Sequence, residues 1–176
     1  VFLDAGQGLH AAHQRGLIHR DFKPDNVLVG SDHRVRVSDF GLAADVDDAT
    51  HAPVDAPVTA LETRLTQTGA LVGTPAYMAI EMLERRGGSA ASDQFAFSVA
   101  LTEALTGRRP MDAETLPKLI EARRTGPAFP TKSQVPDAVW AVLRRGLAAE
   151  PSERYPSMDA LLEGLRRILE RRRRWP

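Results

Sequence analysis

Apolar residues recur at helical spacing in several separate stretches of this 176-residue chain. The spacing predicts amphipathic helices over residues 2–15, 136–147 and 157–169. A more polar helix is predicted over 114–124, interrupted early by Pro117 and lying on the surface. Helices account for most of these elements, so the predicted fold class is mainly α.

Residues 90–105 form the most apolar of the helix candidates, and Gly107 is placed to end it. Phe95, Phe97 and Val99 leave this stretch almost without a polar face, so it belongs at the centre of the fold. Asp93 lies in its first turns and is therefore predicted to be nearly buried. A buried carboxylate needs hydrogen-bond partners, and a supporting role is expected for it.

Two short strands are predicted over residues 26–29 and 34–37, around a turn at Gly30-Ser31-Asp32-His33. Asn26 begins the first strand and Asp39 follows the second. Antiparallel pairing would bring these two oxygen ligands toward each other across the hairpin.

The composition is that of an ordinary soluble globular protein, with 43% hydrophobic and 26% charged residues. The 23 basic and 23 acidic residues balance, so nucleic acid is excluded as a predicted partner. The chain has no cysteine, which excludes disulfides and thiolate chemistry. It also has no apolar run of membrane-spanning length and no signal-peptide pattern at its start.

Chemistry concentrates between His19 and Asn26, in a loop of sequence His-Arg-Asp-Phe-Lys-Pro-Asp-Asn. Phosphoryl transfer requires a carboxylate to orient a hydroxyl, a lysine beside the transferred phosphoryl group, and metal-binding Asn and Asp side chains. Asp21, Lys23 and Asn26 supply the first three, and Asp39 supplies the fourth.

His19 sits between apolar neighbours and is predicted to pack in the core. His10 and His13 lack a third ligand, so they are interpreted as packed or solvent-facing rather than as a metal pair.

Residues 42–70 form a long polar stretch without helical or strand periodicity, and such loops are usually functional or disordered. The stretch leads from Asp39 to a second motif, Gly73-Thr74-Pro75-Ala76-Tyr77.

In these motifs and their order, the chain resembles the eukaryotic-like serine/threonine protein kinases of bacteria. The resemblance extends from end to end and implies a kinase-like large lobe, mainly α, whose small β-hairpin carries the catalytic and metal-binding loops. Residues 1–170 would form this lobe and 171–176 a basic tail.

The resemblance also implies residue roles. Asp21 would accept the proton of the acceptor hydroxyl, Lys23 would stabilise the transferred phosphoryl group, and Thr74 would bridge them. Asn26 and Asp39 would bind Mg²⁺, or Mn²⁺ as an alternative, with ATP. Leu28 would lie beneath the adenine ring.

Further residues of the resemblance are structural or regulatory. Arg154 is predicted to form an ion pair with Glu81, and Asp93 to hold the backbone of the catalytic loop. His19 would pack under Phe40. Thr66 and Thr68 are the predicted phosphoacceptors, and Arg20 offers a phosphate a fork-shaped partner.

The chain departs from the family pattern in two places. The usual Ala-Pro-Glu is Ala79-Ile80-Glu81, from which a small local loosening is expected. The printed sequence contains no Gly-x-Gly-x-x-Gly, and Gly6-Gln7-Gly8 lies within the first helix pattern. Residues 1–176 alone are therefore predicted to have little or no kinase activity, and the full-length parent to be active.

Two other readings are open. An antibiotic-type phosphotransferase would use the same Asp, Asn and metal Asp, but Arg20, Lys23 and the Gly-Thr-Pro-x-Tyr motif favour a protein substrate. A pseudokinase or scaffold module would bind partner proteins without transferring phosphate.

The tail, with arginines at 171–174 followed by Trp175, is usually a solvated helix end. It also suits a juxtamembrane linker in the parent, because clustered arginines favour an anionic leaflet and tryptophan favours the interface. The predicted location is cytoplasmic, with inner-membrane anchoring of the parent as an alternative. The predicted partners are protein substrates and a second copy for autophosphorylation.

Overall fold

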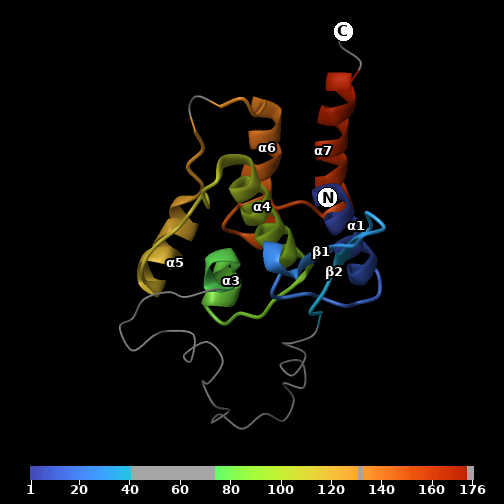
Figure 1. Cartoon of the computed structure of the whole chain (residues 1–176). Helices are drawn as coiled ribbons and strands as arrows, with labels where there is room; N and C mark the ends of the chain where they lie inside the picture. Colours follow the sequence, from blue (N-terminus) through green and yellow to red (C-terminus); the bar gives the residue numbers. More distant parts are fainter. Residues whose placement is uncertain (41–73, 131–132, 174–176) are drawn as a thin grey trace.

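The computed structural model describes residues 1–40, 74–130 and 133–173. Helix α4 (Ala90–Thr106) occupies the centre, with α1 (Phe2–His13) and α7 (Met158–Arg173) on one side and α3 (Ile80–Leu83) and α5 (Leu116–Thr125) on the other (Figure 1). Helix α6 (Asp137–Gly146) packs on both α4 and α7. The prediction of a mainly α fold is confirmed.

Helix α4 is the buried helix that the sequence predicted. All of its residues from Ser92 to Thr102 are buried. The Ser92 hydroxyl accepts the Ser89 N–H at 3.1 Å and so satisfies a donor at the start of the helix. Gly107 ends the helix in the left-handed region, with φ 71°, where a residue without a Cβ is favoured.

Close packing explains why glycine occurs inside helix α1. A Cβ on Gly6 would lie 2.5 Å from Cδ2 of Leu162, a fully buried residue of α7. The glycine lets the two helices approach, so its role in this fold is packing.

The hairpin has the predicted antiparallel pairing, with β1 (Val27–Val29) facing β2 (Val35–Val37) and Val27 opposite Val37. Both strands begin one residue later than predicted, and β2 starts at Val35 and not at Arg34. Asn26 does not begin the strand but closes a 3-10 turn, η1 (Pro24–Asn26), in which its N–H donates to the Lys23 carbonyl at 3.1 Å. Proline at the first position of the turn fixes φ in the helical range, which delays the strand by one residue.

The polar helix α5 was also predicted with the wrong start. It begins at Leu116, so Pro117 lies in its first turn, where a missing N–H costs no hydrogen bond, and does not interrupt it. The remaining turns are 3-10: η3 (Thr74–Tyr77) leads into α3, and η4 (Pro151–Glu153) connects α6 to α7.

The core consists of two hydrophobic clusters. The larger joins α1, α4, α6 and α7, and the smaller lies around Phe95, Met111 and Leu147. Tyr77 and Phe129 are partly buried against both, so the clusters are continuous. None of the described helices is both long enough and apolar enough to cross a membrane.

Candidate active site

The loop that follows α1 is held by Asp93 of the central helix. Its Oδ2 accepts the His19 N–H and its Oδ1 accepts the Arg20 N–H, each at 2.9 Å. Arg20 has a φ of 65°, which is costly for a residue with a Cβ, so the carboxylate holds the backbone in a conformation it would otherwise leave. The predicted hydrogen bonds of Asp93 are confirmed.

His13 completes the shell around Asp93, and the sequence did not reveal this role. Its Nε2 donates to Asp93 Oδ2 at 2.7 Å, and the contact is nearly buried. His13 lies at the end of α1, eighty residues from Asp93 along the chain. The predicted burial of Asp93 implied that its carboxylate has hydrogen-bond partners. The position of His13 in the sequence did not identify the histidine as one of them.

Asp21 follows Arg20 in this loop and has one carboxylate oxygen available. Oδ2 accepts a hydrogen bond from Lys23 Nζ at 3.1 Å, and the two side chains are partly buried. Oδ1 is buried and has no hydrogen-bond partner among the described residues. A buried hydrogen-bond acceptor without a donor is costly inside a protein. Such an acceptor is typical of a site in which a ligand supplies the donor.

Asn26 and Asp39 come together as the hairpin predicts. The Ser38 N–H donates to the Asn26 carbonyl at 2.9 Å, so Asp39 lies one residue beyond the backbone pair. The Asn26 side-chain amide donates to the Asp21 carbonyl at 2.9 Å, which leaves its oxygen for another partner. Asp39 is exposed, with φ 60°.

These two side chains offer oxygen ligands, the type that Mg²⁺ prefers, but they do not form a complete coordination shell. No group of three or more acidic or histidine side chains suited to a metal occurs among the described residues. The donor set therefore fits an ion that takes its other ligands from phosphate oxygens and water.

His19 packs against the residues that precede and follow Asp39. Its ring is buried, lies 4.6 Å from the Phe40 ring between centroids, and makes a 2.8 Å hydrogen bond from Nε2 to the Ser38 carbonyl. The predictions of a core role for His19 and of its contact with Phe40 are confirmed.

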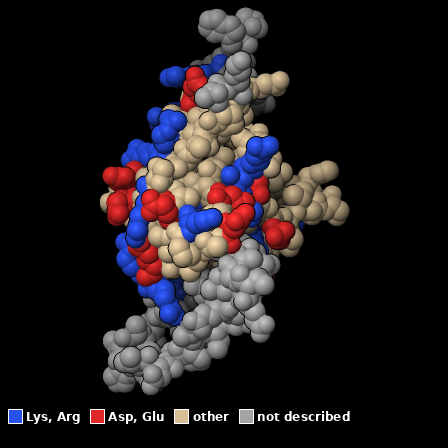
Figure 2. Space-filling view, turned by 90° about the vertical axis from the view of Figure 1, so that its left-hand side faces the viewer, with Lys and Arg blue, Asp and Glu red and all other residues tan. Residues whose placement is uncertain are grey.

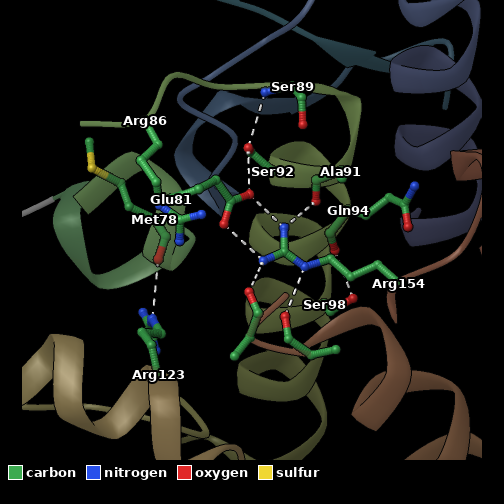
Figure 3. Close-up of polar contacts among 12 residues, drawn as sticks. Met78, Glu81, Arg86, Ser89, Ala91, Ser92, Gln94, Ser98, Arg123 and Arg154 are labelled. Atoms are coloured by element: carbon green, nitrogen blue, oxygen red, sulfur yellow. Dashed lines mark hydrogen bonds and ion pairs between the residues drawn. The ribbon is translucent and has the colours of Figure 1, made fainter. Parts of the chain in front are cut away.

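The predicted ion pair between Glu81 and Arg154 is present and buried (Figure 3). Arg154 donates Nη1 to Glu81 Oε1 at 2.7 Å and Nη2 to Oε2 at 2.9 Å. Its other three N–H groups donate to backbone carbonyls, those of Ala91, Ala148 and Ala149. All five guanidinium donors are satisfied, as a buried cation requires.

Ser92 adds a 2.8 Å hydrogen bond from its hydroxyl to Glu81 Oε1. Burial alone would raise the pKa of Glu81, but the hydrogen bonds and charge of Arg154 outweigh burial and hold that pKa below its usual value. Glu81 therefore stays ionised at neutral pH. The pair ties α3 to the turn before α7.

Tyr77, in the turn that leads to α3, donates its hydroxyl to Glu103 of α4 at 2.6 Å. Burial, followed by the hydrogen bond and charge of Glu103, raises the pKa of Tyr77 to about 12. The phenol therefore remains a donor over the physiological range and fixes the turn to the central helix.

Leu28 lies on β1 and its side chain is exposed. An exposed leucine at this position can contact a ligand or another protein element. Thr66, Thr68 and the side chain of Thr74 lie outside the described residues, so their predicted roles stay predictions.

Charges of both signs are interspersed over the side of the molecule on which α3 and α5 lie (Figure 2).

Comparison with known proteins places these features in a family. A family profile described as "Protein kinase domain" matches residues 1–164. The serine/threonine-protein kinase Pkn1 of Myxococcus xanthus is 37% identical over 164 residues, which cover 89% of this chain and 22% of that protein. PkaA of Streptomyces coelicolor is 35% identical over 166 residues, 92% of this chain and 27% of that protein. The chain thus spans about a quarter of the length of these curated relatives.

Proposed function

Because this chain belongs to the protein kinase family, we propose that it forms the large lobe of a serine/threonine kinase, and that the full-length parent transfers the γ-phosphoryl group of ATP to protein hydroxyls. The observation that carries the proposal is the carboxylate of Asp21, which lies beside Lys23 and has a buried oxygen without a partner among the described residues.

In the proposed reaction, Asp21 accepts the proton of a serine or threonine hydroxyl as that oxygen attacks the γ-phosphorus. The bond from the γ-phosphorus to the bridging oxygen breaks, and ADP leaves. Lys23 faces the transferred group with its positive charge, which stabilises charge on the equatorial oxygens. Mg²⁺, held by Asn26 and Asp39, would neutralise charge on the phosphates.

The loop geometry supports this assignment. Asp93 and His13 fix the backbone before Asp21, and the Asn26 amide ties the metal-binding turn to the Asp21 carbonyl. Catalysis by positioning needs such rigidity, because small displacements of the reacting groups reduce the rate strongly.

The test uses the longest natural protein that contains this chain, incubated with Mg–ATP and a protein acceptor. Asp21→Asn should reduce phosphate transfer by about 10²–10⁴-fold, as loss of a general base does. Asp39→Ala should reduce it comparably by removing a metal ligand. Asp25→Asn is the matched control, since Asp25 is exposed in the same loop and should be neutral. Transfer that persists in Asp21→Asn would refute the proposal.

Mass spectrometry of the same reactions tests the predicted phosphoacceptors. Phosphate should appear on Thr66 or Thr68 in the wild type and be absent in Asp39→Ala. Phosphorylation of neither threonine by an active enzyme would exclude them as acceptors, and a wild-type protein without any transfer would favour the scaffold alternative. Self-association and a membrane tether remain predictions for the parent.

A further inference from the structure

A second fully buried arginine, Arg123 of α5, lacks the carboxylate partner that Arg154 has. It is 0% exposed, and none of the described acidic residues forms an ion pair with it. Burial lowers the pKa of Arg123 to about 10, so the group remains charged at neutral pH. A charge buried without an ion pair is rare and needs compensation by hydrogen bonds, although the charge of Asp112 also favours this cation.

The compensation comes from three backbone carbonyls. Arg123 Nη2 donates to the Ala76 carbonyl at 2.5 Å, Nε to that of Met78 at 3.1 Å, and Nη1 to that of Met111 at 2.7 Å. Ala76 and Met78 flank Tyr77. The guanidinium therefore fixes the backbone on both sides of this residue, and Figure 3 shows the contact with Met78.

Phe95 of α4 links the two buried arginines. The guanidinium carbons of Arg123 and Arg154 each lie 5.0 Å from the centroid of its ring. Such contacts between a cation and an aromatic ring are strongest when both are desolvated, as here. The segment 76–81 is thus held at its start by Arg123 and at its end by Arg154, and both arginines rest on one ring of the central helix.

We propose that Arg123 is a positioning residue that fixes the segment 76–78 against the central helix and so sets the affinity for the protein acceptor. The placement of the segment follows from the contacts above. The effect on the acceptor rests on the proposed function, because this segment belongs to the Gly-Thr-Pro-x-Tyr motif and its continuation, and that motif favours a protein substrate.

Hydrogen exchange on the 176-residue chain tests the placement without requiring catalysis. In Arg123→Met, the amides of Met78, Met82 and Leu83 should exchange at least about tenfold faster, while those of α7 should change little. The Met78 amide donates to the carbonyl of Pro75, just before the segment 76–81, and the Met82 and Leu83 amides donate to the carbonyl of Ala79, within it. Arg124→Met is the matched control, since this neighbouring arginine is exposed and pairs with Glu84.

Unchanged exchange at the three amides, or an equal acceleration throughout α7, would overturn the placement. If Arg123→Met does not fold, Arg123→Lys replaces it. Lysine keeps the charge but cannot reach three carbonyls in one plane, so the same selective acceleration is expected. Uniform acceleration in the lysine variant would equally overturn the placement.

Steady-state kinetics of the longest natural protein tests the effect on the acceptor. Arg123→Met should raise KM for the protein acceptor at least about tenfold, while kcat and KM for ATP stay within about twofold. A fall in kcat at unchanged KM would overturn the assignment to acceptor affinity. An inactive wild type would count against the proposed function, whereas the exchange experiment would still decide the placement of the segment.

Discussion

At the scale of single residues, the buried pair of Glu81 and Arg154 is the strongest constraint beside the site. Glu81→Gln should lower the free energy of unfolding by about 3–5 kcal/mol, because it leaves the Arg154 cation buried without its counter-charge. Urea denaturation followed by circular dichroism measures this. Glu84→Gln, at the residue that follows the same helix, is the control, since Glu84 pairs with exposed Arg124 and a much smaller loss is expected. Equal losses in the two variants would contradict the argument.

The same pair predicts how stability depends on pH. The pKa of Glu81 is lower in the folded protein than its usual 4.5, so the unfolded chain binds a proton first. The stabilisation is complete above about pH 4.5 and is lost as the pH falls through the folded pKa. Denaturation curves across this range should therefore show a steeper acid decline in the wild type than in Glu81→Gln. Parallel declines would exclude Glu81 as the cause.

The sequence predicted some of these residues and not others, for physical reasons. The contact of Glu81 with Arg154 was implied by the resemblance of their motifs to those of protein kinases, and Asp93 lies in an apolar helix where a carboxylate must find donors. Arg123 gave only a weak signal: it follows buried Leu119 by four residues, on the same face of a largely polar helix. Arginine is rarely buried, so the spacing alone favoured an exposed side chain.

At the scale of elements, the packing of α6 on α4 depends on Gly146. A Cβ at this position would overlap the Ser98 hydroxyl oxygen and lie 3.3 Å from Cδ1 of Leu161. Gly146→Ala should therefore lower the free energy of unfolding by about 1–2 kcal/mol, because overpacking outweighs the better helix propensity of alanine. Thermal or urea denaturation gives the value.

Ser98→Ala supplies the check on that prediction. The Ser98 hydroxyl donates to the Gln94 carbonyl within α4, so its removal strands no buried donor. The double variant Gly146→Ala, Ser98→Ala should recover at least half of the loss. No recovery would show that the oxygen is not the obstacle.

Element boundaries were predictable only where a backbone signal was strong. Gly107 ended α4 as expected, because a left-handed residue there needs glycine. Pro117 and Pro24 were harder to interpret, since proline both breaks helices and begins them. Which of the two occurs depends on the neighbouring turns and not on the proline itself. The first strand was predicted to begin at Asn26 because Pro24 was not recognised as the start of a 3-10 turn.

At the scale of the whole molecule, α4 contacts α1, α6 and α7 together with the turns η3 and η4, and Tyr77 and Phe129 pack against both hydrophobic clusters. Such continuity predicts that the lobe unfolds as one cooperative unit. Trp140, which is buried and stacked on Phe129 with the ring centroids 4.9 Å apart, reports the link between α6 and the clusters.

Thermal unfolding of Trp175→Phe should therefore give the same midpoint by Trp140 fluorescence as by far-ultraviolet circular dichroism. The substitution removes the other tryptophan of the chain, which lies outside the described residues. A fluorescence transition at lower temperature would mean that the region around α6 separates first from a helical remainder.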